Sequence, residues 1–419
     1  MWLATRLVLL FLLAGPESMA RGDATYYYLK VADLAKVGLT HTMPEYPTPV
    51  VWLLQLPSLL GGFQMVYVRT FVALMVLVDL ALAMWLWLRG RRNGTFAAAN
   101  FWTWFIFLIG PLVFARFDII PAFLAAAALL LLARFPAVSG GLVALGAAIK
   151  LWPAALIAGL LGQRHGRWAL WLGFGVTGIV LVAASVMTAG WHRLLSPVVW
   201  QKERGLQIES VWATPAMLNA LVHPGRYKIH VSSFNAWEIL GQGVSLLLLA
   251  STVATLIGGL AILALGVRAW RSRGHDLYAG AMVMTTVIAI MITTNKTLSP
   301  QYLVWLGGPL AVLLLVRPGR LPVADRLLVA LALLMGVLTQ LIFPIFYEVL
   351  NVLQPSVGHT LMTLDLAIRN LALVVFTVLS FVRAWVLVGA SAPASVRVGS
   401  GRPPLPAVGS DDVLPDTVR

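Results

Sequence analysis

Long apolar runs recur along almost the whole chain, and they constrain the fold more than any other feature of the sequence. The runs fall near residues 2–16, 66–88, 97–114, 118–133, 137–149, 151–162, 168–190, 236–267, 277–294, 299–316, 322–346 and 360–388. A run of about 18 or more apolar residues is typical of a helix that spans a lipid bilayer. We therefore expect an all-α fold, a polytopic transmembrane helical bundle with about 10–12 membrane helices that include short, broken ones.

The overall composition supports a membrane protein and not a set of soluble domains. Hydrophobic residues make up 60% of the chain and charged residues 11%, against about 45–50% and about 25% in soluble domains. We expect a single transmembrane domain over residues 1–389. Residues 390–419 are rich in Ser, Pro, Gly and Val, which predicts a disordered cytoplasmic tail. Residues 1–20 have features of a signal peptide, but we expect a retained first helix because the rest of the chain continues as membrane protein.

Several apolar runs are shorter than the about 20 residues that a full span needs. The stretch 137–162 has Lys150 and Pro153 in its middle, which predicts a hairpin of two short helices with Lys150 at its tip. Non-helical backbone at membrane depth survives only where protein or a water-filled cavity covers it. Short, broken helices therefore indicate a cavity inside the bundle.

The basic residues between the runs predict an orientation in the membrane. The formal net charge is +14, from 30 Lys and Arg against 16 Asp and Glu. These cations are scattered in short loops, which argues against a nucleic-acid partner and for the positive-inside rule. Compact basic loops occur at 89–92, 164–167, 268–273 and 317–320, and with twelve crossings all four fall on one side. We expect that side, and both chain ends, to be cytoplasmic in a multi-pass protein of the cell membrane.

The segments on the predicted outer side carry a different set of residues. They contain Asp, Glu, Tyr, Gln, His and Trp, and also cations that break the positive-inside rule: Arg116, Lys150, Lys202, Arg204 and Lys296. A cation near the apolar core is costly unless something compensates its charge. A bound phosphate or pyrophosphate group would do so, and this predicts an anion site facing the extracytoplasmic side.

The sequence excludes some classes of site. There is no cysteine, so disulfides, thiolate catalysis and cysteine metal sites are excluded. The seven histidines include no pair at i, i+4, and we expect neither a zinc centre nor another metal or cofactor.

Asp23 is the first candidate for chemistry, because it follows the first helix at the mouth of the membrane. Transfer of a sugar from a phosphate-linked donor needs a base for the acceptor hydroxyl and cations for the departing phosphate. Asp23 could be that base, or it could cap a helix predicted over 24–36. Glu45, in the rigid proline turn that follows, is a second candidate acid.

Two further breaks carry candidate anion ligands. Arg116 and Asp118 lie between short helices, where Asp118 could cap the next helix and Arg116 could hold a phosphate oxygen. Ser299-Pro300 predicts a helix start with proline at its first position, which leaves free N–H groups beside Lys296. Asp79 lies deep in an apolar helix and has no charged neighbour in the sequence. Asp365 and Arg369 are spaced i, i+4, and we expect them to pair with each other.

At these residues the chain resembles the bacterial GT-C membrane glycosyltransferases, in particular the polyprenyl-phosphate-mannose-dependent alpha-mannosyltransferases of glycosyltransferase family 87. The resemblance rests on six separated pieces in the family's order: Asp23 with its tyrosines, Glu45-Tyr46-Pro47, Phe117-Asp118-Ile119-Ile120-Pro121, Ala148-Ile149-Lys150-Leu151-Trp152-Pro153, Arg204-Gly205-Leu206-Gln207-Ile208-Glu209-Ser210 and Lys296-Thr297-Leu298-Ser299-Pro300-Gln301-Tyr302-Leu303.

The resemblance implies a GT-C fold and an inverting transfer of a hexose, mannose in this family, from a polyprenyl-phosphate donor to a glycolipid or glycan acceptor. By this reading Asp23 is the general base. The donor phosphate would bind Lys150, Lys296, Arg204 and Arg116. Sugar or acceptor groups would meet Glu45, Tyr46, Asp118, Gln207, Glu209, Gln301 and Tyr302.

The chain departs from the family pattern at two places. The usual Tyr-Pro-Pro is replaced by Tyr46-Pro47-Thr48-Pro49, and the spacing after Asp23 is short, so Asp33 or Glu45 are alternatives for the base. No second acid stands beside Asp23, and we expect a metal-independent transfer. The alternative function is a transporter or flippase of a lipid-linked sugar, which would need polar residues along a whole path through the membrane. A third reading is a non-catalytic subunit of an envelope assembly complex.

Overall fold

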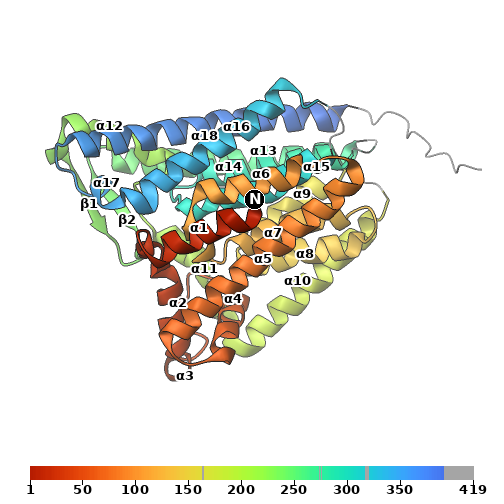
Figure 1. Cartoon of the computed structure of the whole chain (residues 1–419), viewed down its shortest axis with the longest axis horizontal. Coiled ribbons are helices and arrows are strands. Elements are labelled where there is room, and N and C mark those ends of the chain that lie inside the picture. The colour runs from red at the N-terminus through yellow and green to blue at the C-terminus, as the bar shows by residue number, and fades with distance from the viewer. Residues whose placement is uncertain (163–164, 273, 275, 317–319, 391–419) are drawn as a thin grey trace, which may run out of the picture.

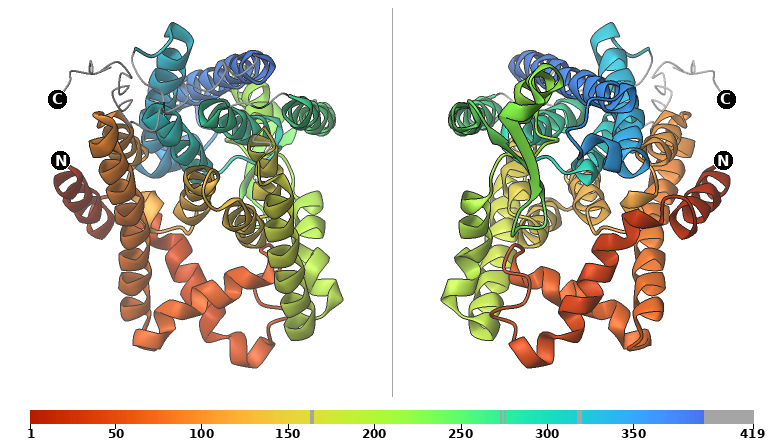
Figure 2. Two further views of the ribbon diagram at one scale, coloured as in Figure 1. Left: turned by 90° about the vertical axis from the view of Figure 1, so that its right-hand side faces the viewer. Right: turned by 90° about the vertical axis from the view of Figure 1, so that its left-hand side faces the viewer.

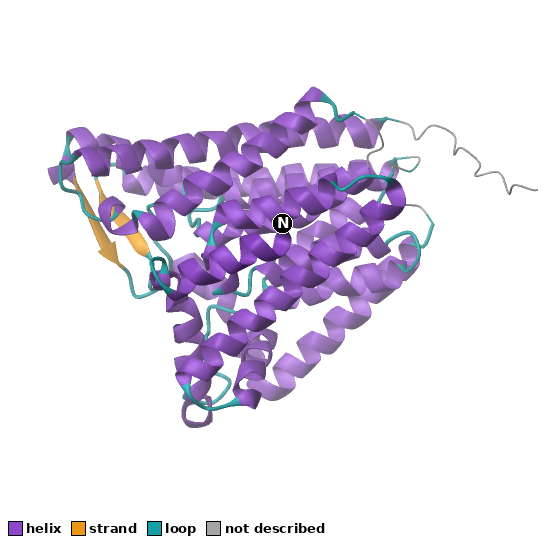
Figure 3. Cartoon of the chain, in the orientation of Figure 1, coloured by secondary structure: helices purple, strands orange, loops and turns teal. Residues whose placement is uncertain are grey.

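The computed structural model describes residues 1–162, 165–272, 274, 276–316 and 320–390. Among these residues, six helices are long and apolar enough to cross a membrane. They are α5 (Gln64–Asn93), α10 (Arg167–Ala189), α13 (Val244–Arg271), α14 (Leu277–Thr294), α16 (Val323–Gln340, continued by the π-turn η8, Leu341–Ile345) and α18 (Val357–Gly389). The other elements are short helices, apart from one two-stranded ribbon (Figures 1 and 3). The predicted all-α polytopic bundle is therefore confirmed.

Shorter helices fill the spaces between the long ones. At the N-terminus, α1 (Trp2–Ala14) is followed by η1 (Ser18–Arg21) and α2 (Gly22–Ala32), and the pair α1 and η1–α2 is bent by 86°. The other short elements are α3 (Leu34–Val37), α4 (Thr48–Gln55), η2 (Leu56–Leu60), α6 (Ala97–Ile109), η3 (Pro111–Phe114), α7 (Ile119–Leu131), α8 (Pro136–Ile149), η4 (Trp152–Leu156), α9 (Ile157–Leu160), α11 (Trp191–Glu203), η5 (Val211–Ala213), α12 (Thr214–Val222), η6 (Pro224–Arg226), η7 (Pro300–Leu303), α15 (Val304–Val316) and α17 (Tyr347–Leu350).

The core forms around α14, which packs against α15 and α18, while α15 also packs against α6 and α7. In the spanning window of α14, 83% of the residues are buried, against 11% in α10 and in α13. Exposed leucines and valines along α10 and α13 therefore form apolar outer surfaces, which a bilayer can cover without cost.

The described parts of the basic loops that were predicted on one side lie at one end of the bundle, the right-hand end in Figure 1. Asn93, the last residue of α5, donates to the Leu315 carbonyl near the end of α15 (3.4 Å), and Arg268 of α13 donates to the Trp385 carbonyl of α18 (3.0 Å). Arg164, Arg273 and Arg317 of these loops lie outside the described residues, as do residues 391–419 of the predicted tail.

A two-stranded ribbon departs from the predicted pattern. Strands β1 (Tyr227–Val231) and β2 (Trp237–Gly241) pair antiparallel, with Val231 opposite Trp237. The sequence predicts a loop up to residue 235 and a helix from 236, but the helix begins at Val244. A short apolar run fits a strand or a buried helix equally well, and here Gly243 at φ +79 breaks the chain before the helix. The ribbon lies across the face seen in the right panel of Figure 2.

Candidate active site

The breaks between helices bring several of the predicted polar residues into contact. Asp23 lies in the first turn of α2, whose N-cap position is Arg21, so Asp23 is not the helix cap. Its carboxylate forms an ion pair with Arg116, and Arg116 also hydrogen-bonds the side-chain oxygen of Gln301. Three residues from segments far apart in the sequence therefore form one chain of contacts.

Lys150 and Asp118 form a second ion pair next to the first. The Lys150 ammonium lies 2.6 Å from Asp118 Oδ1, and the Trp305 indole N–H donates to the same oxygen at 2.7 Å. Asp118 occupies the N-cap position of α7 but makes no capping hydrogen bond, so its side chain serves the cluster and not the helix. The predicted break at Lys150 is confirmed, since α8 ends at Ile149 and Lys150 has an extended backbone.

Three aromatic rings stack beside Lys150. Tyr302 stacks on Trp305 with ring centroids 4.3 Å apart, and Trp152 also stacks on Trp305, with ring centroids 4.4 Å apart. The Lys150 ammonium lies 5.0 Å from the ring centroids of both Tyr302 and Trp305. Trp305 was absent from the sequence prediction, although it follows Tyr302 at i, i+3, a spacing that places two side chains on one helix face.

The proline turn brings further acid and phenol groups to the same place. The Tyr26 hydroxyl donates to Glu45 Oε1 at 2.6 Å, and the ring of Tyr46 packs edge-on against Phe117 at 5.1 Å. Desolvation raises the pKa of Tyr46 well above its ordinary value, and the charges of Asp23, Glu45 and Asp118 add to the effect. Tyr46 therefore stays protonated and can donate a hydrogen bond to a ligand.

Buried Arg193 of α11 holds this turn in place. Its guanidinium donates to the carbonyl oxygens of Thr42 at 3.1 Å and Met43 at 2.8 Å, and the arginine side chain is 1% exposed. Sequence reasoning missed Arg193, because it lies in a stretch that was predicted to be an outer loop. The contact fixes Glu45 and Tyr46 relative to the rest of the bundle.

The segment 204–209 is held against the ribbon. The Gly205 N–H donates to Glu238 Oε1 at 3.1 Å, and Ile208 N–H donates to the Trp237 carbonyl at 3.0 Å. A Cβ at position 205 would meet the Glu238 carboxylate, so a larger residue there would push that carboxylate away from the Gly205 N–H. The ribbon that the sequence did not predict is thus the support for a motif that it did predict.

Lys296 lies at the edge of this segment. Its ammonium donates to the backbone carbonyls of Lys202 (2.9 Å) and Arg204, and the Gln207 N–H donates to the Lys296 carbonyl at 3.2 Å. Burial lowers the pKa of Lys296 from its ordinary value. Arg204 Nε and Gln207 Oε1 are buried and have no hydrogen-bond partner among the described residues, which leaves both free for a ligand.

The sequence prediction for Arg369 was wrong. Arg369 hydrogen-bonds the Oε2 of Glu209 at 3.1 Å and the Glu209 carbonyl at 2.5 Å, and not Asp365. Glu209 and Arg369 are 0% and 1% exposed, so removal of either partner would leave a buried charge unpaired. Burial raises the pKa of Glu209, and the Arg369 charge opposes that shift.

Two parts of the site can now be distinguished. A central cluster joins Asp23, Arg116, Gln301, Lys150 and Asp118, with Tyr46 and Tyr302 beside it. A peripheral part consists of Lys296 and the Glu209–Arg369 pair, each tied to backbone carbonyls. In the described part of the chain no group of three or more His, Cys, Asp or Glu residues could hold a metal ion.

Comparison with known proteins gives one match. The model of glycosyltransferase family 87 matches residues 45–294, which is more than half of the 419 residues. Searches of curated proteins and of solved structures gave no match.

Proposed function

This chain belongs to glycosyltransferase family 87, and from that premise we propose which sugar it moves and how. It is a membrane glycosyltransferase. In our proposal it transfers a hexose, namely mannose, from a polyprenyl-phosphate donor to a glycolipid or glycan acceptor. The reaction takes place at the outer face of the cytoplasmic membrane and inverts the anomeric carbon.

The observation that carries this proposal is the central cluster, where one arginine contacts both the candidate base and a candidate sugar ligand. Arg116 joins Asp23 to Gln301, and the Lys150–Asp118 pair lies beside them. A carboxylate next to cations, between broken helices, suits a transfer in which a proton and a phosphate leave in different directions.

In the proposed step, an acceptor hydroxyl oxygen bonds to the anomeric carbon while the bond from that carbon to the phosphate oxygen breaks. The polyprenyl phosphate leaves with the bonding electrons, and Arg116, Lys150, Arg204 and Lys296 offset its charge. The hydroxyl proton passes to the Asp23 carboxylate. Glu45, Tyr46, Asp118, Gln207, Glu209, Gln301 and Tyr302 bind or position the sugar and acceptor groups in this proposal.

The test compares three carboxylates of the N-terminal segment. We expect Asp23→Asn to lose transfer from a labelled polyprenyl-phosphate sugar by at least about 100-fold, as removal of a general base does. Asp33→Asn is the matched control, because Asp33 is exposed and, among the described residues, its carboxylate forms an ion pair only with Lys36, at 3.6 Å. Glu45→Gln tests the remaining alternative.

Each variant is purified in detergent, and its monodispersity and melting temperature are compared with those of the wild-type protein before transfer is measured. Full activity in folded Asp23→Asn would reject the assignment of the base. A selective loss in Asp33→Asn or Glu45→Gln would move the base to that residue. The same assay with other polyprenyl-phosphate hexoses identifies the sugar.

A further inference from the structure

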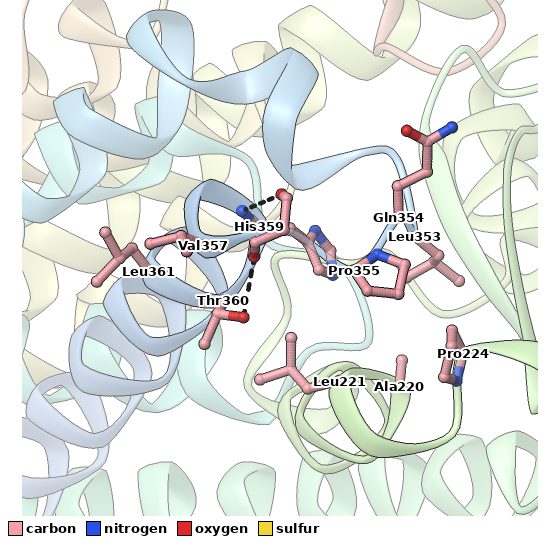
Figure 4. Close-up of a pocket in the computed structure, with 11 residues that line it drawn as sticks. Ala220, Leu221, Pro224, Leu353, Gln354, Pro355, Val357, His359, Thr360 and Leu361 are labelled. Carbon is pink, nitrogen blue, oxygen red and sulfur yellow. Dashed lines mark hydrogen bonds between the residues drawn. The ribbon is translucent and has the colours of Figure 1, made fainter.

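A separate pocket of about 250 Å³ opens where α12 meets the start of α18. Figure 4 shows its lining: Ala220, Leu221 and Pro224 on one side, and Leu353, Gln354, Pro355, Ser356, Val357, His359, Thr360 and Leu361 on the other. None of these residues belongs to the candidate active site. The pocket nevertheless lies toward the same end of the bundle, the left-hand end in Figure 1.

His359 is the polar feature that this pocket leaves unexplained. Its side chain is 3% exposed, and its Nδ1 lies 3.1 Å from the Val349 carbonyl oxygen, so Nδ1 carries the proton and donates. Its Nε2 is buried and has no hydrogen-bond partner in the described part of the chain. In the neutral ring Nε2 is then a hydrogen-bond acceptor. A buried acceptor without a donor is costly, and a ligand hydroxyl in the pocket would supply the donor.

The remaining lining provides complementary groups. Val357 is the first residue of α18. The N-cap Ser356 side chain already accepts from the His359 N–H at 3.0 Å, so the N–H groups of Val357 and Gly358 remain without a carbonyl partner within the helix and can donate to a ligand oxygen. The opposite wall, from Ala220 and Leu221, is apolar (Figure 4). A wall that accepts and donates hydrogen bonds, facing an apolar wall, matches a pyranose ring, which has hydroxyls along its edge and C–H groups on its face.

We propose that this pocket is a subsite for one sugar residue of the acceptor glycan, located outside the site where transfer occurs. The volume of about 250 Å³ is just below the roughly 300–1,000 Å³ of drug-sized ligand sites, and it suits a single ring. His359 lies eleven residues before Asn370 on α18, or about 16 Å along the helix, and Asn370 donates to the Ser210 carbonyl beside Glu209. An acceptor more than one sugar long could therefore reach both places. This inference rests on the proposed function for the identity of the ligand as an acceptor.

Two variants test the pocket independently. His359→Phe removes the Nε2 acceptor and keeps a ring, and Leu221→Trp fills the pocket while leaving residue 359 a histidine. Val222→Trp is the matched control, because Val222 is the next residue on α12, is 72% exposed and does not line the pocket. The full chain, in detergent micelles, is titrated with methyl hexopyranosides and a hexose disaccharide, and binding is read by saturation-transfer NMR.

We expect glycoside binding to the wild-type protein and to Val222→Trp, and loss of binding in Leu221→Trp. In His359→Phe we expect at least about fivefold weaker binding, the effect of one lost hydrogen bond. In transfer assays the acceptor KM should rise in both pocket variants, by at least about fivefold in His359→Phe and by more in Leu221→Trp, with the donor KM unchanged.

The pocket proposal and the transfer proposal can fail separately. Glycoside binding that is lost in the pocket variants and kept in Asp23→Asn supports the subsite, even if no transfer from polyprenyl phosphate is ever observed. Absence of glycoside binding to the wild-type protein, or unchanged binding in folded Leu221→Trp, would overturn the subsite whatever the transfer assay shows.

Discussion

At the residue scale, the charges of the candidate site are already compensated before any substrate binds. Lys150 is paired with Asp118, and Lys296 is held by two backbone carbonyls. These contacts allow buried cations to exist near a membrane, where an uncompensated charge is expensive. The two lysines differ in what holds them, so their removal should reveal whether each one binds phosphate or only supports the backbone.

We predict that Lys150→Ala and Lys296→Ala each weaken use of the donor more than use of the acceptor. A lost charge-assisted hydrogen bond to phosphate costs about 1.5–3 kcal/mol, so the donor KM should rise by roughly 10- to 150-fold. Steady-state kinetics with varied donor and then varied acceptor separate the two effects.

Lys202→Ala is the control for this comparison, because the Lys202 side chain is exposed and only its carbonyl contacts Lys296. A defect confined to acceptor use would move the phosphate site elsewhere. If Lys296→Ala lowers the melting temperature and leaves both KM values unchanged, Lys296 is a support for the 202–204 backbone.

A buried ion pair far from the site explains Asp79, which the sequence left without a partner. Arg6 donates to both oxygens of Asp79 at 2.7 and 2.9 Å, and the indole N–H groups of Trp2 and Trp102 donate to them at 2.8 and 2.7 Å. The pair joins α1 to α5 and α6. Its Arg6 is 73 positions away, so no local pattern could reveal it.

We predict that Asp79→Leu destabilises the protein by about 3–5 kcal/mol, because it leaves Arg6 buried and unpaired. The double variant Arg6→Met, Asp79→Leu should recover part of the loss, since both charges are then removed. Thermal unfolding in detergent measures the difference. A double variant no more stable than Asp79→Leu alone would contradict a direct ion-pair effect.

At the element scale, small residues let α8 and α10 pack with their backbones in contact. A Cβ at Gly173 of α10 would overlap the Ala137 carbonyl of α8, and a Cβ at Gly140 of α8 would overlap the Leu170 carbonyl of α10. Small residues at such crossings are typical of membrane helix pairs. The pair supports the break at Lys150, which directly follows α8.

We predict that Gly173→Val destabilises the protein by about 1–3 kcal/mol, because the added side chain forces the two helices apart. Gly178→Val is the control on the same helix, since a Cβ there meets nothing within 4 Å. Melting temperatures of the two variants in one detergent provide the comparison, and equal effects would show that valine in α10, not the crossing, is responsible.

The sequence predicted those elements whose boundaries are encoded locally. Pro300 follows Ser299 and begins a helical turn, as expected, and α8 ends at Lys150 because a lysine and a proline interrupt an apolar run. The ribbon was missed because the short stretch Ala236–Leu240, in which four apolar residues surround Glu238, does not distinguish a strand from a helix. Arg369 was paired wrongly because spacing on one helix says nothing about carboxylates on another segment.

For the candidate site, the sequence predicted the residues of the central cluster but not all of the residues that hold them. Motifs and misplaced cations identified the residues of the central cluster, because each departs from its own surroundings. Trp305 and Arg193 were missed because neither departs from its surroundings in the sequence. A tryptophan is ordinary in an apolar helix, and only the structure shows that Trp305 donates to Asp118. An arginine is ordinary in a polar segment, and only the structure shows that Arg193 donates to the carbonyls before Glu45.

At the scale of the whole molecule, the bundle has two different ends. The described parts of the basic loops lie at one end, and α2, the β1–β2 ribbon, α12 and the start of α18 lie toward the other (Figure 1). The long helices between them expose apolar side chains along α10 and α13. This polarity is the basis for proposing that the catalytic end faces outward, since short basic loops favour the cytoplasm.

The absence of cysteine from the sequence allows a direct test of this orientation. Ser233 lies in the ribbon turn and Arg92 at the opposite end of the bundle, and both are exposed. In intact cells, a membrane-impermeant maleimide should label Ser233→Cys and leave Arg92→Cys unlabelled, while permeabilised cells should label both. Labelling of Arg92→Cys alone in intact cells would reverse the orientation and place the transfer site in the cytoplasm. That result would exclude an outer-face acceptor even if Asp23 proved essential, so the orientation and the chemistry must be tested separately.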